Sequence, residues 1–482
     1  MGFHGRVSKG CERCRQRKVK CDQRKPSCLR CEKANAQCPG YRNMTDVLFR
    51  DESERIVRRV RVLNGDMHEP PLSALSTSST SASPSTAVIS HSLSQPVTEL
   101  AANFFFSKYY ACDGPPPPDG FPHWLAQSYC HLAPSHALRA VIEATGMAGI
   151  SNVHNAPELA SRSKQQYGRA LESLQRALSD PVEAMADTTL VTVSLFGLFE
   201  FITFDDWDRS RAWTAHIAGA TALLQLRGQK QFDSELGAQL FQQLRSQMLY
   251  ACVQHDIPVS PELLQLSHMF DISDVGRRRR ESRPGPLGSL VFRLLKLRDA
   301  IRCQELSLSD AAAIWRTATE IERDLVAWGA YLPAYATVAA LPDGSPVMYF
   351  QGKQHVYDNL TLAQAWNNWR TLRVVVNRII LDYSVPSDLA GKVEASDALL
   401  TIQELSRDIC MSAPSFIGSP RIVGIIWPLS VVAREPANPL PTRRWAVEQL
   451  RVTSQSMGFR QAGLLAETIS RQLDALAGKA TT

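Results

Sequence analysis

Residues 11–38 read CERCRQRKVKCDQRKPSCLRCEKANAQC and hold six cysteines. The cysteines fall at positions 11, 14, 21, 28, 31 and 38, so a C-x2-C-x6-C pattern occurs twice, separated by six residues. Zinc takes four ligands in a tetrahedron, and thiolate sulfur is a favoured ligand. Two zinc ions need eight ligand places, which six thiols can fill if two of them bridge both ions. Cys11 and Cys28 open the two halves of the repeat and are therefore the predicted bridges.

The repeat also divides the six thiols between the two ions. A disulfide framework would need an oxidising compartment, and the first ten residues, MGFHGRVSKG, lack the apolar core of a signal peptide. A redox pair would use only one C-x2-C, and a mononuclear zinc site would leave two cysteines without a role. The sequence therefore predicts two structural zinc ions with every place filled by sulfur, one held by Cys11, Cys14, Cys21 and Cys28 and the other by Cys28, Cys31, Cys38 and Cys11.

The basic residues concentrate around these cysteines. Residues 1–62 carry 17 Lys and Arg against 7 Asp and Glu, whereas the whole chain has a formal charge of +6. The remaining residues are therefore slightly acidic as a group. A compact positive surface on a metal module is the electrostatic signature of a nucleic-acid binder. The sequence thus predicts that residues 8–43 form a domain that binds double-stranded DNA.

The cysteine pattern resembles the fungal zinc binuclear cluster (Zn2Cys6) DNA-binding domain at every cysteine. The basic segment that this family has between its second and third cysteines is present as Arg15–Lys20, RQRKVK, and its loop proline is present as Pro26. The resemblance implies two short helices around two zinc ions, a nuclear location and recognition of CGG-type triplets. In the resembled family a lysine at the position of Lys18 contacts the triplet, which makes Lys18 the candidate base-reading residue.

The two predicted helices of this module differ in charge. The first is expected after Cys14, over Arg15–Lys20, and the second after Cys31, over Glu32–Gln37, related to the first by pseudo-twofold symmetry. The first is the more basic, so it is expected to face the major groove, where Arg and Lys read guanine O6 and N7. Phosphate contacts fix the register of a protein on DNA without carrying sequence information. They are assigned, with a solvated side chain as the alternative for each, to Arg15, Arg17, Lys20, Arg24 and Lys25.

Residues 44–65 are predicted to form a basic linker helix. Phe49, Ile56 and Leu63 recur at intervals of seven, and zinc-cluster proteins often dimerise through a coiled coil just after the cluster. This seam spans about two heptads, whereas a convincing coiled coil needs three or four. Two interpretations stay open: a homodimer formed through this seam, and a single helix that packs on its own protein.

The remainder of the chain divides into a linker and a large domain. Of the 27 residues from 70 to 96, 13 are Ser or Thr and 4 are Pro, so residues 66–96 are predicted to be a disordered linker. From residue 97 onward, clusters of Gly, Pro and Asp separate long amphipathic segments, and no alternating strands or Gly-rich phosphate loop occur. The sequence therefore predicts a large all-α regulatory domain over residues 97–480, with a dozen or more helices.

One segment of this domain carries a second resemblance. Residues 212–228, AWTAHIAGATALLQLRG, are similar to the W-x-x-H-x-x-G-A-x-x-L-L-x-x-R-G signature of the fungal-specific transcription factor regulatory domain. Trp213, His216 and Ala220 are spaced by three and four residues, so they share one helix face. Arg227–Gly228 is expected to end this helix with a cation and a glycine cap. His216 is therefore interpreted as a packed structural histidine rather than as a catalytic base.

The sequence gives little support to catalysis or membrane insertion. It contains no GxSxG, HExxH or Walker A pattern, so no enzymatic activity is expected. The longest apolar run, residues 422–433, is too short to cross a bilayer, and the chain is expected to be soluble and intracellular. Arg277–Arg280 is interpreted as an exposed loop between helices, with a nuclear import signal as the alternative.

These features together predict a sequence-specific regulator of RNA polymerase II genes that works with the transcription machinery. The short linker and modest length favour an activator of a biosynthetic (secondary-metabolite) or metabolic gene cluster. One alternative is a repressor or a ligand-sensing regulator of nutrient metabolism. An alternative of another class is a zinc-module scaffold that binds proteins without reading DNA, which would leave the basic charge of Arg15–Lys20 unexplained.

Overall fold

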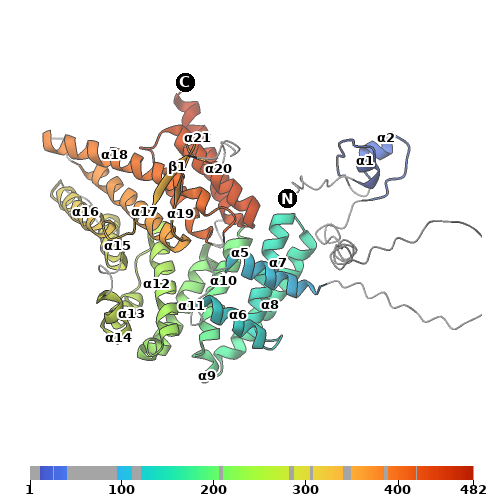
Figure 1. Ribbon diagram of the computed structural model, residues 1–482, viewed down its shortest axis with the longest axis horizontal. Coiled ribbons are helices and arrows are strands. Elements are labelled where there is room, and N and C mark those ends of the chain that lie inside the picture. The colour runs from blue at the N-terminus through green and yellow to red at the C-terminus, as the bar shows by residue number, and fades with distance from the viewer. Residues whose placement is uncertain are drawn as a thin grey trace, which may run out of the picture. The chain divides into compact units, whose positions relative to one another are not determined.

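The computed structural model describes ten stretches of the chain, which fall into two units with a boundary between Ser94 and Gln95 (Figure 1). The predicted helix over residues 44–65, with its candidate dimerisation seam, lies outside the described residues, as does the predicted linker apart from Gln95 and Pro96. The described stretches are residues 11–24, 27–40, 95–110, 121–205, 210–281, 287–303, 308–339, 349–384, 389–419 and 421–480.

Two short helices form the regular structure of the first unit where it is described: α1 (Glu12–Gln16) and α2 (Leu29–Lys33). Two helices are as predicted, but the predicted ranges Arg15–Lys20 and Glu32–Gln37 are wrong, because each helix begins three residues earlier. The physical reason is that the C-x2-C pair is itself the first turn. Before α2, the backbone of Cys28 is extended and its Sγ accepts a hydrogen bond from the Cys31 amide at 3.4 Å.

Both helices end with a residue in the left-handed backbone region. Lys18 follows α1 with φ +52°, and Asn35 follows α2 with φ +45°. In each case the next amide reaches back to a cysteine carbonyl, Cys14 at 3.0 Å or Cys31 at 3.1 Å, as in a Schellman helix ending. Asparagine tolerates this backbone conformation, whereas a lysine adopts it rarely. Lys18 therefore occupies a position that its backbone preferences do not favour.

The second unit is helical throughout most of its described length, which confirms the predicted fold class. No described helix combines the length and the apolar character that spanning a membrane requires. The helices are α5 (Val97–Tyr109), α6 (Phe121–His131), α7 (Ala137–His154), α8 (Pro157–Leu178), α9 (Pro181–Ala184), α10 (Asp187–Thr203), α11 (Ser210–Arg227), η2 (Gly228–Phe232), α12 (Glu235–His255), α13 (Pro261–Ile272), α14 (Asp274–Glu281), α15 (Leu287–Cys303), α16 (Leu308–Gly329), α17 (Leu360–Tyr383), α18 (Leu389–Ser412), η3 (Ala413–Ser415), α19 (Val423–Arg434), α20 (Leu440–Met457) and α21 (Arg460–Ala480).

A two-stranded sheet is the one departure from an all-α unit among the described residues. β1 (Ala336–Ala339) pairs antiparallel with β2 (Lys353–Val356), with Ala336 opposite Val356. β1 is exposed along its length, while β2 packs against α18 and η3. Strands of four residues are too short to produce a recognisable alternation of apolar and polar residues. The sequence therefore gave no sign of this hairpin.

Helix α7 lies in contact with α5, α8 and α10. Most of its residues are buried, and its small residues let the neighbouring backbones approach closely. A Cβ added to Gly146 would lie 1.9 Å from the carbonyl oxygen of Ala101 in α5. A Cβ added to Gly149 would lie 2.1 Å from the Tyr109 hydroxyl. The contact between α5 and α7 thus depends on glycine at both positions.

We expect Gly146→Ala to destabilise the second unit, because the added methyl group would meet the Ala101 backbone and overpacking of this kind costs about 1–3 kcal/mol. Gly168 in α8 is the matched control, since nothing lies within 4 Å of its Cβ position. Gly168→Ala should instead stabilise the unit by about 0.5–1 kcal/mol. Denaturant unfolding of the full chain measures both changes. An unfolding midpoint for Gly146→Ala equal to that of the wild type would contradict the close approach of α5 and α7.

The helix that carries the second resemblance is α11. It ends at Arg227, and Gly228 follows with φ +52°, which confirms the predicted helix end. The His216 ring stacks on Phe196 with centroids 5.7 Å apart, and its Nε2 lies 3.4 Å from the Tyr167 hydroxyl. These contacts with two other helices support the interpretation of His216 as a packed structural residue.

The four arginines Arg277–Arg280 do not form a loop, so that interpretation is wrong. They belong to helix α14, which starts immediately after Ser273. The Ser273 hydroxyl accepts a hydrogen bond from the Gly276 amide at 3.1 Å, and its carbonyl accepts one from the Arg277 amide at 2.9 Å. This N-terminal cap satisfies amides that a helix otherwise leaves without partners, and it starts a helix in spite of the arginine run.

Candidate metal centre and nucleic-acid interface

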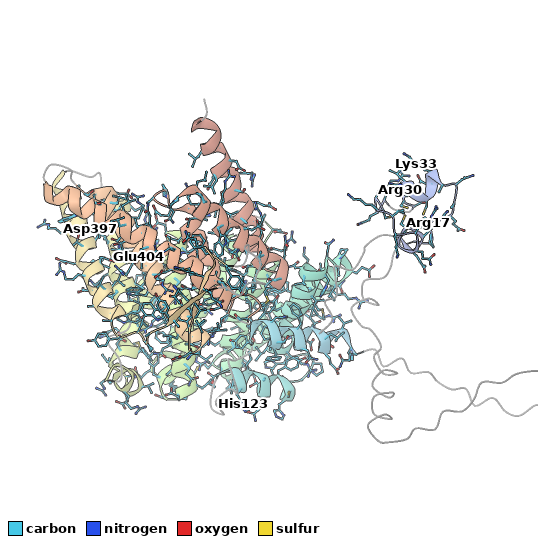
Figure 2. The ribbon with its side chains drawn as sticks, turned by 45° about the horizontal axis from the view of Figure 1, so that its top comes forward. Arg17, Arg30, Lys33, His123, Asp397 and Glu404 are labelled. Atoms are coloured by element: carbon cyan, nitrogen blue, oxygen red, sulfur yellow. The ribbon has the colours of Figure 1, made fainter. Side chains whose placement is uncertain are left out.

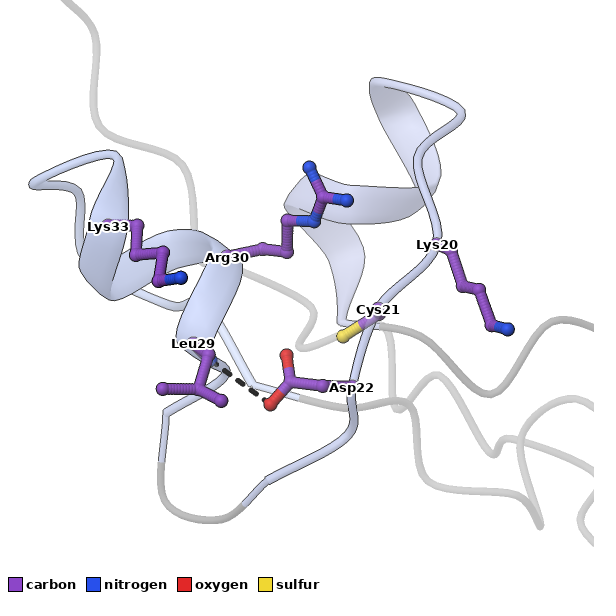
Figure 3. A pocket seen from close by; sticks show the side chains of 6 residues that line it. All are labelled: Lys20, Cys21, Asp22, Leu29, Arg30 and Lys33. Carbon is purple, nitrogen blue, oxygen red and sulfur yellow. Dashed lines mark hydrogen bonds between the residues drawn. The ribbon is translucent and has the colours of Figure 1, made fainter.

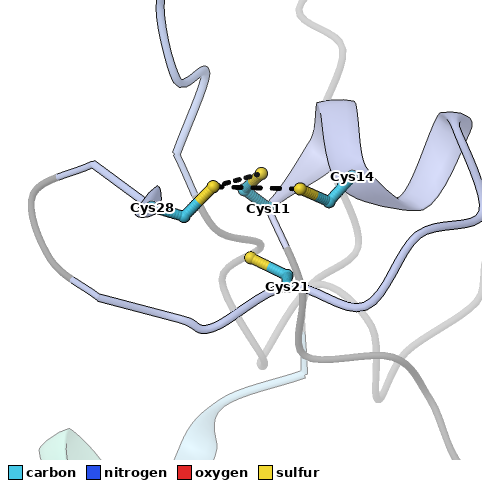
Figure 4. Close-up of side chains that lie close together, drawn as sticks. All are labelled: Cys11, Cys14, Cys21 and Cys28. Atoms are coloured by element: carbon cyan, nitrogen blue, oxygen red, sulfur yellow. Dashed lines mark hydrogen bonds between the residues drawn. The ribbon is translucent and has the colours of Figure 1, made fainter. Parts of the chain in front are cut away.

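The thiols of the first unit lie close together, and Figure 4 shows four of them, those of Cys11, Cys14, Cys21 and Cys28. Cys11, Cys14, Cys28 and Cys31 are almost completely buried. The sulfur of Cys11 lies 3.7 Å from those of Cys28 and Cys31, and the sulfurs of Cys14 and Cys28 are 3.8 Å apart. A zinc–sulfur bond of about 2.3 Å implies a tetrahedron edge of about 3.8 Å. The spacing of the sulfurs therefore fits thiolates that share zinc ions.

The sulfurs form two overlapping quartets, in each of which the ligand atoms lie within 4.8 Å of one another. Cys11 and Cys28 belong to both quartets, and they are the two residues that the repeat predicts as bridges. Four thiolates fill a tetrahedral zinc site and leave no open position for water, which is the arrangement of a structural metal site. The two quartets are Cys11, Cys14, Cys21, Cys28 and Cys11, Cys28, Cys31, Cys38.

The two halves of the module are related by a shift of 17 residues in the sequence, and the first amides of the two helices, which this shift relates, both donate to a residue that follows a third cysteine. The first amide of α1, that of Glu12, donates to the Gly40 carbonyl at 3.2 Å. The first amide of α2, that of Leu29, donates to the Asp22 carboxylate at 3.2 Å. Each bond ties a helix start to the segment that follows the third cysteine of a repeat.

Protonation differs between the inner and outer thiols of the module. Burial, followed by hydrogen bonds among the sulfurs, raises the pKa of Cys14 to about 12 and also raises the pKa of Cys31. Burial, the largest single influence, raises the pKa of Cys21, but backbone hydrogen bonds and hydrogen bonds with the Cys28 and Cys14 thiols together lower it to about 7. Backbone hydrogen bonds likewise lower the pKa of Cys38 to about 7. The thiols of Cys21 and Cys38 are thus more readily available as thiolates than those of Cys14 and Cys31, from which metal binding must displace protons.

Most of the predicted DNA-contacting residues follow α1 in the chain. Arg17, Lys18 and Lys20 are exposed and follow one another in the turn and extended segment after the helix. Arg24 is also exposed, but its guanidinium lies 2.8 and 2.9 Å from the two carboxylate oxygens of Glu32. The backbone of Arg15 belongs to α1, its side chain lies outside the described residues, and so does Lys25. The structure therefore brings Arg17, Lys18 and Lys20 together and gives Arg24 a partner of its own.

The predicted set of DNA-contacting residues does not include three further cations of the module: Arg13, Arg30 and Lys33. They lie on α1 and α2, and together with Arg17 they border a groove between these helices; Figure 2 marks Arg17, Arg30 and Lys33. The prediction assigned the second helix to Glu32–Gln37, which made it look poor in cations. The 17-residue repeat, which aligns Arg30 with Arg13, is the sequence feature that indicates a pair of arginines on the two helices.

Two family models match the chain. The fungal Zn(2)-Cys(6) binuclear cluster domain matches residues 9–46, and the fungal specific transcription factor domain matches residues 123–460. The second match covers more than half of the chain. No solved structure matches the chain.

Curated proteins match over the cysteine-rich segment. The transcriptional regulatory protein moc3 of Schizosaccharomyces pombe is 53% identical over 38 residues, 8% of each chain. The arginine metabolism regulation protein II of Saccharomyces cerevisiae is 66% identical over 32 residues, 7% of this chain and 4% of its own. The aspercryptin biosynthesis cluster-specific transcription regulator atnN of Emericella nidulans is 46% identical over 41 residues, 8% of this chain and 7% of its own. The chain thus covers less than a tenth of the length of these relatives.

Proposed function

Because the chain belongs to the fungal Zn2Cys6 transcription factors with a fungal-specific transcription factor domain, we propose that it regulates RNA polymerase II genes in the nucleus by reading CGG-type triplets in DNA. Proteins of this family bind DNA, and two zinc ions hold their cluster domain together. The proposed zinc ligands are the two thiol quartets that overlap at Cys11 and Cys28. When bound, zinc supplies the cross-links that a module with two five-residue helices cannot obtain from an apolar core.

The observation that carries the base-reading role is the conformation of Lys18. Its side chain is exposed at the end of α1, and its backbone is left-handed with φ +52°. The related position in the other half of the module holds Asn35, a residue that suits this backbone. Unfavourable backbone conformations cluster at functional sites, where the surrounding structure enforces them. We assign Lys18 to the guanines of the triplet, whose O6 and N7 atoms accept hydrogen bonds in the major groove.

The neighbouring cations serve the phosphate backbone in this proposal. Arg17 and Lys20 flank Lys18 and are exposed, so they can reach phosphates on either side of a base contact. Arg24 would have to exchange Glu32 for a phosphate oxygen, since the two side chains form an ion pair at 2.8 Å. Arg15 and Lys25 complete the proposed set. Contacts of this kind raise affinity for any sequence and weaken as salt is added.

The second unit has the regulatory role in this proposal. Its helical core, matched by the fungal specific transcription factor domain over residues 123–460, would control the transcription machinery, and a homodimer would set the spacing of paired triplets. Among the relatives, one is named for arginine metabolism and one for a biosynthesis cluster. We favour activation of a biosynthetic (secondary-metabolite) or metabolic gene cluster. A repressor or ligand-sensing regulator of nutrient metabolism is the alternative.

The proposal is tested by selecting duplexes from a random pool with the full-length protein, with and without zinc. We expect enrichment of single or paired CGG triplets that disappears when a chelator removes the metal. The distance between paired triplets would report whether the protein binds as a dimer. Zinc-loaded protein that enriched no sequence would overturn the DNA-reading role and favour the alternative of a zinc-module scaffold for protein partners.

A further inference from the structure

A groove runs between α1 and α2, beside the thiol cluster. It has a volume of about 550 Å³, and its cationic lining consists of Arg13, Arg17, Arg30 and Lys33. A smaller hollow of about 310 Å³ shares Arg30 and Lys33 with it (Figure 3). Figure 3 draws Arg30 extending from α2 into the space between the two helices. The smaller hollow is also lined by Asp22, whose carboxylate accepts a hydrogen bond from the Leu29 amide. Because this negative charge would repel an anion, the larger groove is the better anion site.

The groove follows the internal symmetry of the module. Six of its eight lining residues form three pairs whose members are 17 positions apart, so the groove lies where the two halves of the module face each other. One of these pairs places a guanidinium on each helix. The pairs are Arg13 with Arg30, Cys14 with Cys31, and Arg17 with Ala34.

The charge of the groove favours an anion. Two zinc ions and six thiolates carry a formal charge of −2, which by itself would repel a phosphate. The four lining cations contribute +4, so the surroundings of the groove are positive overall. Arg17, Arg30 and Lys33 are exposed to solvent, and Arg13 is half-buried. Guanidinium groups bind phosphate with two parallel hydrogen bonds, and the symmetric pair offers one such group from each side.

We propose that this groove binds one phosphate group of the DNA backbone, clamped between Arg13 of α1 and Arg30 of α2, with Lys33 as an additional cation. The inference rests on the proposed DNA-binding function and extends it to the second helix. α2 thereby anchors the module on the duplex while the segment after α1 reads bases. A phosphate held at the junction of the two halves fixes the orientation of both helices on the DNA.

The test measures how salt affects DNA binding by the full-length protein. The variant is Arg13→Gln/Arg30→Gln, and the matched control is Arg162→Gln/Lys164→Gln, which removes an exposed Arg and Lys from α8 in the second unit. Affinities are measured for a duplex with a CGG triplet and for one with a scrambled site, between about 50 and 200 mM salt. The zinc content of every variant is determined first, and Lys33→Gln provides a second probe of the groove.

Each phosphate contact contributes about 0.9 to the slope of log K against log salt. We expect Arg13→Gln/Arg30→Gln to make this slope shallower by about 0.9, the share of the one phosphate that the two arginines clamp, with an equal loss of affinity on both duplexes. Lys33→Gln should change the slope in the same direction by a smaller amount. The control should have the wild-type slope. The variant Arg13→Lys/Arg30→Lys, which keeps both positive charges, should have a slope close to that of the wild type.

The outcomes separate this inference from the function on which it rests. An unchanged slope in the zinc-loaded groove variants, with wild-type protein that still prefers the CGG duplex, would overturn the phosphate site and leave the proposed function intact. Wild-type protein without a CGG preference would overturn base reading, while a shallower slope on both duplexes would still support the phosphate site.

Discussion

Cys28→Ser is expected to abolish both zinc sites at once and to unfold the DNA-binding module. Cys28 belongs to both thiol quartets, and its sulfur lies 3.7 Å from Cys11 and 3.8 Å from Cys14. It also caps α2 through the Cys31 amide. Structural zinc contributes about 10–16 kcal/mol in small zinc-finger peptides, far more than two short helices could replace. Specific DNA binding should therefore be lost entirely.

Elemental analysis of the purified full-length protein measures this effect as zinc bound per chain. We expect two ions in the wild type and none in Cys28→Ser, with Cys11→Ser behaving in the same way because the two bridges are equivalent. Cys38→Ser, which affects one quartet, should retain more zinc than either. Cys130→Ser is the control, since Cys130 is an exposed thiol of the second unit. A Cys28→Ser protein that kept one full zinc ion would show that Cys28 is not a bridge.

Lys18→Asn is expected to reduce specific DNA binding without weakening the module. Asparagine suits the left-handed backbone that residue 18 adopts with φ +52°, so folding and zinc content should be preserved or improved. Loss of a good contact to a guanine costs about 1–3 kcal/mol, a reduction of about 5- to 150-fold in affinity for the CGG duplex. Affinity for a scrambled duplex should fall much less, so the preference for CGG is lost.

The related residue in the other half of the module provides the control for Lys18. Asn35→Lys puts a lysine into the same backbone conformation after α2, where φ is +45°. We expect this variant to lose a little stability and to keep the CGG preference. The measurement is the ratio of affinities for CGG and scrambled duplexes in wild type, Lys18→Asn and Asn35→Lys. A Lys18→Asn protein with the wild-type ratio would assign base reading to another residue.

The sequence was most informative where chemistry imposes a spacing. Zinc requires four thiolates at fixed distances, so six cysteines in two matched sets were enough to indicate the quartets and their shared members. The end of α11 was also predictable, because Arg227 and Gly228 are local signals of a helix terminus. In both cases the interacting residues lie within a short stretch of the chain. The local sequence pattern is therefore enough to predict the structure that they form.

Predictions that depended on helix boundaries were less successful. The helices of the zinc module start three residues before their predicted ranges. In α2 the reason is that the Cys28 sulfur accepts a hydrogen bond from the Cys31 amide and so caps the helix at its start. The earlier start places Arg30 on α2 and at the groove, whereas a helix starting at Glu32 would have excluded it. The arginine run of α14 gives no helix signal of its own, because the residue that caps the helix, Ser273, lies outside the charged segment.

The buried cluster around Arg370 illustrates what a linear pattern cannot contain. Arg370 is fully buried and donates a hydrogen bond to the Tyr357 hydroxyl at 2.8 Å. Its guanidinium lies 4.8 Å from the centre of the Tyr335 ring, and its Nε lies 3.9 Å from the Asp408 carboxylate. These partners come from both sides of the β1–β2 hairpin and from α18. A buried cation requires compensation from several directions, and here residues far apart in the chain supply it.

The sequence by itself determined the metal chemistry of this protein, its basic terminal module and its large helical unit, because thiol spacing, charge and periodicity are local properties of the chain. Only the tertiary structure decided that Arg13 and Arg30 border one groove and that a short hairpin packs against α18. The physical reason is that each of these features depends on how separate segments pack together. Such packing follows from the three-dimensional arrangement of the whole chain.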